Sequence, residues 1–169
     1  DRMQVVKATV ECQTAQAQGR ILANPVSALR SNPPEANTAV DGYGFAYAGG
    51  AAGTQVLPLV AGRSAAGVPF AAKVPAGHAV RVLTGAALPD GVDTVVLDED
   101  VTASATQIAF RGPLKRGANT RQAGEDIVKG SEALPAGRLL TPADLALLSA
   151  VGCAQVPVRA RLRVAVLST

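Results

Sequence analysis

The sequence predicts an α+β protein: a β-rich middle, over roughly residues 45 to 125, lies between segments that combine short strands with helical turns. Through the middle, short apolar runs alternate with turn signals such as Pro75-Ala76-Gly77 and Pro89-Asp90-Gly91, which is the pattern of a compact β unit. Near the C-terminus, the run Thr141-Pro142-Ala143-Asp144 has the composition of a helix start. Hydrophobic residues make up 48% of the 169 residues, which is enough for a core in one or two small domains.

Short strands are expected along the whole chain. They cover residues 5–12, 20–23, 55–60, 68–74, 79–83, 92–97, 107–111, 156–158 and 162–167. Residues 13–18 are rich in Ala and Gln and favour one or two helical turns. Pro58 lacks a backbone N–H, so the strand that contains it is expected at the edge of a sheet.

The last of these runs, residues 162–167, is nearly all apolar. Such a run is typical of a strand buried on both faces, between neighbouring strands. Because the sequence supplies no such neighbours, we expect the chain to be a fragment whose next domain has been cut off.

The expected helix begins after residue 140. Thr141 supplies the N-cap oxygen, Pro142 fits the first helical position, and Asp144 stands where a capping-box acid belongs. Gly152 is the residue expected just past the end of the helix. One apolar face follows at helical spacing: Leu145, Leu147, Leu148 and Val151.

Composition excludes several classes of protein. The net charge of +3 is too small to indicate a nucleic-acid binder, and aromatic residues, at 3%, are too few for a base-stacking surface. Cys12 and Cys153 form neither a disulfide framework nor a zinc motif, and His78 is the only histidine. We read the cysteines as small buried hydrophobes in a reducing compartment, which makes the cytoplasm the default location.

The most informative stretch runs from Asn32 to Gly44. Two consecutive prolines at its start favour extended backbone, and Asp41-Gly42 is a strong turn signal. One carboxylate, that of Asp41, is thereby held in a rigid connection. The alternative interpretation is a turn that only connects two domains.

Two further runs combine polar groups with strand ends. Thr84-Gly85 follows a predicted strand, so the hydroxyl and the next N–H groups can face a ligand; a simple strand-ending turn is the alternative. In residues 121–126 a cation, Arg121, shares a loop with Glu125 and Asp126. A solvated hairpin is the alternative there, and the acidic run 98–100 is read as an exposed turn. Carboxylates beside guanidinium groups suit Mg²⁺-assisted chemistry on a phosphate or a similar oxyanion.

At these places the sequence resembles the molybdopterin molybdenumtransferase family, of the MoeA and gephyrin E-domain type. The matching runs are residues 19–23, 37–43, 81–86, 88–91, 95–96, 119–121, 124–127, 135–137, 140–142 and 164–169. Each run alone is a weak signal, but their order and spacing hold across nearly the whole chain. The last run is similar to the first strand of that family's molybdopterin-binding domain.

The resemblance implies a division into domains. A discontinuous mixed α/β domain for linking and dimerisation would comprise residues 1–43 and 127–160. A β-rich domain, like a β-roll or barrel, would be inserted in it over residues 44–126. Residues 161–169 would be the first strand of a truncated molybdopterin-binding α/β domain.

The resemblance also implies a reaction: insertion of molybdate into adenylylated molybdopterin, with release of AMP and the aid of Mg²⁺. It places Asp41, Thr84 and Asp126 as catalytic residues, with Arg121 and Glu125 beside them for the substrate. Asp41 and Asp126 would bind the metal. The family relationship further implies a homodimer, with a molybdopterin adenylyltransferase and molybdoenzymes as partners, and neither nucleic acid nor membrane.

The sequence departs from the family pattern where Thr38-Ala39-Val40 precedes Asp41 and where the approach to Gly124 is reduced to Arg121-Gln122-Ala123. Fewer cations near an oxyanion site leave a second function open, that of a non-catalytic paralogue for dimerisation or cofactor delivery. In either case we expect the 169 residues alone to be inactive, because the family's cofactor-binding domain is missing.

Overall fold

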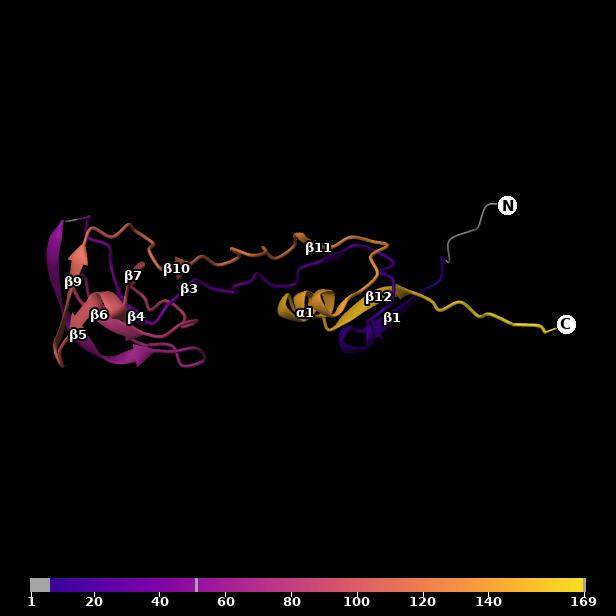
Figure 1. Ribbon diagram of the computed structural model, residues 1–169, viewed down its shortest axis with the longest axis horizontal. Helices are drawn as coiled ribbons and strands as arrows, with labels where there is room; N and C mark the ends of the chain where they lie inside the picture. Colours follow the sequence, from indigo (N-terminus) through magenta and orange to yellow (C-terminus); the bar gives the residue numbers. More distant parts are fainter. Residues whose placement is uncertain (1–6, 51, 169) are drawn as a thin grey trace. The chain divides into compact units, whose positions relative to one another are not determined.

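The structure is a computed structural model that describes residues 7–50 and 52–168 (Figure 1). Its strands are β1 (Thr9–Gln13), β2 (Val26–Ser27), β3 (Asn37–Thr38), β4 (Gly42–Phe45), β5 (Gly53–Ser64), β6 (Ala79–Val82), β7 (Thr94–Leu97), β8 (Val101–Ala103), β9 (Gln107–Gly112), β10 (Thr120–Arg121), β11 (Glu132–Leu134) and β12 (Gln155–Arg159). The helices are α1 (Pro142–Ala150) and two 3₁₀ turns, η1 (Thr14–Gln16) and η2 (Asp98–Asp100). The described residues are therefore mostly strands and turns, with one α-helix.

The chain forms two compact units. Unit 1 comprises the residues up to Asn32 and those from Asp126 onward, and unit 2 comprises Pro33–Glu125. The functional assignment of these units to a dimerisation domain and an inserted domain stays a prediction.

Unit 2 is built on a curled six-stranded sheet (Figure 1). The strand order is β7-β4-β6-β5-β9-β8, and β4 runs antiparallel to both of its neighbours. Because of this direction, the start of β4 lies beside the end of β6 and the end of β7. Polar residues at those three strand ends are thus brought to one edge of the unit.

Strand β5 is interior to the sheet, so the edge position predicted from Pro58 was wrong. The first half of β5 pairs with β9 as far as Pro58, and the second half pairs with β6 from Leu59 onward. Pro58 therefore stands where the strand changes partners, at a point where the missing N–H breaks no continuous ladder.

Both faces of the central strands are covered. On one face Tyr43, Phe45 and Phe110 belong to a single buried cluster, in which the two phenylalanine rings lie 5.2 Å apart. On the other face Val80 and Val82 pack in a second cluster. Double burial fixes the register of the sheet, because a slip of one residue would exchange the two sets of side chains.

Unit 1 joins distant parts of the chain. Strand β1 pairs with β12, and β2 pairs with β11, both antiparallel. Together with α1 these strands enclose one core, whose fully buried members include Leu22, Leu140, Leu148, Val156 and Val158.

Helix α1 begins as predicted. The Asp144 N–H is 3.4 Å from Thr141 Oγ1, and the Thr141 N–H donates in return to Asp144 Oδ2 at 2.8 Å, which completes the capping box. Arg138 Nε also donates to Asp144 Oδ1, at 2.8 Å. Gly152 follows the helix with φ of +87°, a conformation that glycine adopts without strain.

Replacing Asp144 with alanine should destabilise the chain by about 2 kcal/mol, because the side chain is buried and caps a helix while it bonds a guanidinium. The hydrogen bond from Arg138 lowers the pKa of Asp144 from 3.8 to about 2. The stabilisation that comes from ionised Asp144 is therefore fully present above pH 3.8 and is lost as the pH falls through about 2. Urea unfolding at pH 7 and at pH 2.5 measures both effects, and a Glu11→Gln variant at an exposed position serves as the control. Equal unfolding midpoints for the wild type and D144A at pH 7 would contradict this account.

Two other predicted strands are absent. Residues 68–74 form no strand, because their N–H groups bond elsewhere: Phe70 donates to Ser64 Oγ and Val74 donates to the Asp90 carbonyl. Residues 162–167 also form no strand among the described residues, and their apolar side chains are exposed, as at Leu167, which is 90% exposed. No described strand pairs with this run, so its nearly continuous apolar composition alone does not make it a strand. Residues 20–23 contribute only isolated bridges, and positions 5 and 6 of the first predicted strand lie outside the described residues.

Candidate functional site

Three polar groups meet where β4 begins and where β6 and β7 end. Asp41 immediately precedes β4, Thr84 follows β6, and Asp98 follows β7. The Asp98 N–H donates to the Asp41 carbonyl at 3.1 Å, which continues the ladder between β4 and β7 past the last paired residues. The sheet topology therefore builds this cluster from residues that are far apart in the sequence.

Asp41 and Thr84 are directly bonded. The Thr84 hydroxyl donates to Asp41 Oδ1 at 2.6 Å, and the Thr84 N–H donates to the same oxygen at 2.7 Å. These bonds, first that of the hydroxyl and then that of the N–H, lower the pKa of Asp41. At neutral pH the pair thus presents an ionised, oriented carboxylate, and both residues are exposed.

Arg81 links the neighbouring carboxylate to the sheet. Its guanidinium binds Asp98 through two nitrogens and lies 4.9 Å from the centre of the Tyr43 ring. The bond from Arg81 lowers the pKa of Asp98, and Arg81 also attracts Asp41. One cation therefore offsets two carboxylates that would otherwise repel each other.

Asp98 was not among the predicted site residues, although its run was correctly read as exposed. The signal that would have found it is the register: pairing of Gly42 with Leu97 puts the residues just outside that pair, Asp41 and Asp98, beside each other. The sequence alone does not reveal that β4 and β7 are neighbours, because two other strands separate them along the chain.

Arg121 and Glu125 form a second pair in unit 2. Arg121 Nε donates to Glu125 Oε1 at 3.0 Å, and the Gln122 N–H donates to Oε2 at 3.1 Å. The bond from Arg121 lowers the pKa of Glu125. Arg121 lies on β10, which pairs with β3, and β3 ends three residues before Asp41. The loop thus joins the Asp41 segment through backbone pairing.

Asp126 belongs to unit 1, unlike the other four predicted site residues. Its N–H donates to the Asn32 carbonyl at 2.9 Å, and its Oδ2 accepts from Asn32 Nδ2 at 3.2 Å. The structure thus brings Asp41 together with Thr84, and Arg121 together with Glu125. A site shared by Asp41 and Asp126 stays a prediction.

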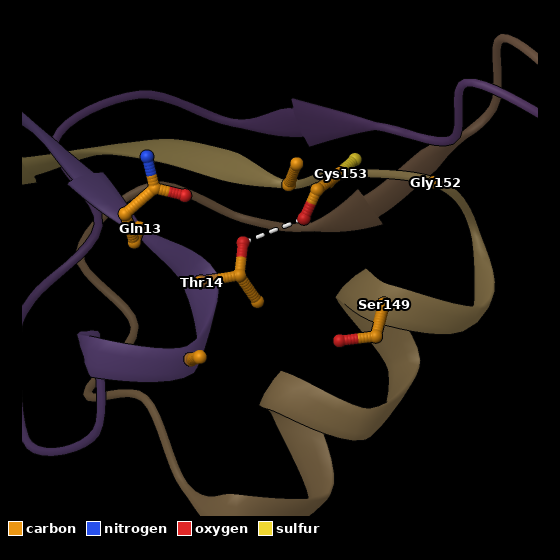
Figure 2. A pocket seen from close by; sticks show the side chains of 7 residues that line it. Gln13, Thr14, Ser149, Gly152 and Cys153 are labelled. Carbon is orange, nitrogen blue, oxygen red and sulfur yellow. Dashed lines mark hydrogen bonds between the residues drawn. The ribbon is translucent and has the colours of Figure 1, made fainter.

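Unit 1 contains a separate pocket of about 320 Å³, shown in Figure 2. Its side chains include Gln13, Thr14, Ser149 and Cys153, and the Thr14 hydroxyl donates to the Cys153 carbonyl at 2.6 Å. Burial raises the pKa of the Cys153 thiol, which keeps it protonated. With no carboxylate and no cation in its lining, this pocket lacks the groups that phosphate chemistry requires.

Within residues 7–50 and 52–168, no three His, Cys, Asp or Glu side chains cluster closely enough to form a metal centre by themselves. Mg²⁺ is commonly held by one or two carboxylates together with water and substrate phosphates. The Asp41 carboxylate fits that role, because it is exposed and ionised and both of its described hydrogen bonds fall on one oxygen, Oδ1.

No helix in the described part of the chain is long and apolar enough to cross a membrane.

The chain corresponds to the N-terminal region of a family of larger enzymes. The family model described as "MoeA N-terminal region (domain I and II)" matches residues 1–152, so the chain belongs to the MoeA N-terminal family, and the resemblance seen in the sequence is confirmed. The chain is 40% identical over 156 residues to the molybdopterin molybdenumtransferase of Haemophilus influenzae, covering 91% of this chain and 38% of that protein. It is 38% identical to the enzyme of the same name from Synechococcus elongatus, covering 89% of this chain and 38% of that protein.

Solved structures of MoeA proteins also match this chain. The crystal structure of the molybdopterin biosynthesis MoeA protein from Pyrococcus horikoshii OT3 matches with a TM-score of 0.83 at 32% identity, covering 91% of this chain and 41% of that one. A second structure of the Pyrococcus protein matches with a TM-score of 0.80. The mostly stranded fold with one helix is therefore that of MoeA proteins. The chain spans about two fifths of the length of the relatives it matches.

Proposed function

We propose that this chain is the N-terminal part of a molybdopterin molybdenumtransferase that inserts molybdate into adenylylated molybdopterin and releases AMP. The observation that carries the proposal is the bonded pair of Asp41 and Thr84 at the edge of the unit 2 sheet, in a chain of the MoeA N-terminal family. The relatives that it matches are named for this transfer. In this reaction water attacks the phosphorus of the AMP moiety and the bond from that phosphorus to the bridging oxygen breaks, so AMP leaves with the water oxygen and the bridging oxygen stays on the molybdopterin phosphate. Molybdate forms two Mo–S bonds to the dithiol, whose two protons leave with one molybdate oxygen as water.

The roles follow from the contacts. Asp41, kept ionised by Thr84, orients the attacking water or a bound cation, and its carboxylate can accept a proton from that water. Arg121, held by Glu125, presents a fixed guanidinium to the phosphate or molybdate oxygens. Asp126 is the second carboxylate of the proposed site. Mg²⁺, held by Asp41 and Asp126, would neutralise charge on the phosphate oxygens.

The wider setting is proposed on the same basis. From the family resemblance we also propose a homodimer, with a molybdopterin adenylyltransferase supplying the substrate and molybdoenzymes receiving the product. A cytoplasmic location is consistent with two cysteines, Cys12 and Cys153, that are both unpaired.

A second candidate function is a non-catalytic paralogue that serves dimerisation or cofactor delivery. The observation in its favour is that Arg121 is engaged with Glu125, in a loop that has Gln122 and Ala123 where the family pattern has further arginines. A guanidinium that already binds a carboxylate attracts an oxyanion less strongly.

The deciding experiment measures AMP release from adenylylated molybdopterin in the presence of molybdate and Mg²⁺. It uses the longest natural protein that carries this chain and, in parallel, the 169 residues alone. Catalytic AMP release by the longer protein and none by the 169 residues is the expected result. Tight cofactor binding by the longer protein without AMP release would favour the non-catalytic function. Turnover by the 169 residues alone would refute the expectation that they are inactive.

A further inference from the structure

A second pocket of unit 1, of about 340 Å³, is lined by three arginines and by no carboxylate. Arg20 precedes a bridge at Ile21, Arg159 ends β12, and Arg161 follows two residues later. The lining is Gln18, Gly19, Arg20, Ile21, Arg159, Ala160, Arg161 and Leu162. We infer that this pocket is a binding site for a small, multiply charged oxyanion of the phosphate class, separate from the cluster around Asp41.

Two of the arginines are held in place by the backbone. Arg20 donates from one terminal nitrogen to the Arg159 carbonyl at 2.8 Å, and Arg159 donates to the Ala23 and Lys7 carbonyls at 3.3 and 3.2 Å. Both side chains belong to half-buried residues. A guanidinium has five N–H donors, so these bonds orient each group and leave donors on both of them for a ligand. Preorganised donors of this kind bind oxyanions at a reduced cost in side-chain entropy.

No carboxylate in the described part of the chain offsets these charges. Other arginines form ion pairs there, for example Arg138 with Asp144 and Arg116 with Asp93, whereas the three pocket arginines form none. The acid on the neighbouring strand, Glu11, lies opposite Pro157, and it forms no ion pair with any residue in 7–50 or 52–168. Neutral carbonyls satisfy hydrogen bonds but leave the positive charge uncompensated. Three cations that line one pocket therefore create a positive potential that an anion with two or more charges would neutralise.

The dimensions indicate more than a single small ion. A pocket of about 340 Å³ lies at the lower end of the range for small-molecule sites, roughly 300 to 1,000 Å³. Pyrophosphate, or the phosphate end of a nucleotide, has the charge and oxygen count to engage all three guanidinium groups. The apolar side chains of Ile21 and Leu162 in the lining suit a ligand with an organic part.

The experiment is a titration of the 169-residue chain with pyrophosphate. Binding is measured by calorimetry and by the NMR signals of the backbone amides of Gly19, Ile21 and Ala160. Saturable binding that moves these signals is expected, and it should weaken as NaCl is raised. Arg161→Gln should weaken it about tenfold, because one charge-assisted contact is lost. Arg161 is exposed and makes no described hydrogen bond, so its loss leaves the fold intact.

Lys129→Gln is the matched control, because it removes the same charge from an exposed position of unit 1 that does not line the pocket. It should change the affinity less than twofold. A parallel titration with AMP separates the two sources of phosphate: tighter binding of AMP supports a nucleotide ligand, and tighter binding of pyrophosphate supports a free oxyanion. Equal weakening by both variants, or no saturable binding of either probe at about 10 mM, a concentration that detects even weak sites, would overturn the inference.

Discussion

Replacing Asp41 with alanine should lower the rate of AMP release in the longer enzyme by at least about 100-fold, the range expected when a general base or its equivalent is lost. The fold should survive, because both Asp41 and Thr84 are exposed and their bonds to each other are not part of a core. The measurement compares kcat and KM for AMP release in the wild type and D41A, with circular dichroism as the check on folding. Wild-type turnover by a folded D41A variant would remove Asp41 from the mechanism.

The Thr84 variants make this prediction specific. Thr84→Val removes the hydroxyl, which is the largest cause of the lowered pKa of Asp41, so the pKa of Asp41 should rise toward its ordinary value. An activity that needs ionised Asp41 would then be lost at a higher pH on the acid side of its profile than in the wild type. Thr84→Ser keeps the hydroxyl and should keep the wild-type profile. A purely structural role for Thr84 would lower activity without moving the acid limb.

Sequence patterns located the elements whose signals are local. The capping box of Thr141 and Asp144 was predicted correctly because all of its atoms come from four consecutive residues. Strands β6, β7 and β9 were likewise predicted to within two residues at each end, since a turn signal bounds each of them. Local chemistry decides such features, so the sequence is sufficient for them.

Features that depend on distant partners were predicted poorly. Pro58 indicated an edge strand, but a strand that changes partners at its proline can lie inside a sheet. Residues 68–74 have the composition of a strand, yet two of them, Phe70 and Val74, pack into the cluster that contains Val80 and Val82. In the candidate site, Asp41 and Thr84 were identified from sequence motifs. The contribution of Asp98 could not be, because it depends on which strands are neighbours.

Replacing Gly42 with alanine should have the largest effect on stability of any substitution considered for this chain, about 4 kcal/mol or more. A Cβ atom at Gly42 would overlap the carbonyl oxygen of Val96, and a backbone atom in a paired strand cannot move aside as a side chain can. β4 would have to separate from β7, and the position of Asp41 would be lost with it. Asp41-Gly42 therefore owes its glycine to the close approach of two strands, because its φ is not in the left-handed region.

Gly44, two residues further along β4, provides the matched control. A Cβ atom there would lie 2.7 Å from Val92 Cγ1, the end of a side chain that can rotate. Gly44→Ala should thus cost only about 1 to 3 kcal/mol, the range for a tolerated overpacking of a core. Urea unfolding of both variants, followed by the fluorescence of Tyr43 and Tyr47 in unit 2, measures the difference. Equal destabilisation by the two substitutions would show that β4 and β7 approach less closely than described, and the placement of Asp41 beside Asp98 would then need revision.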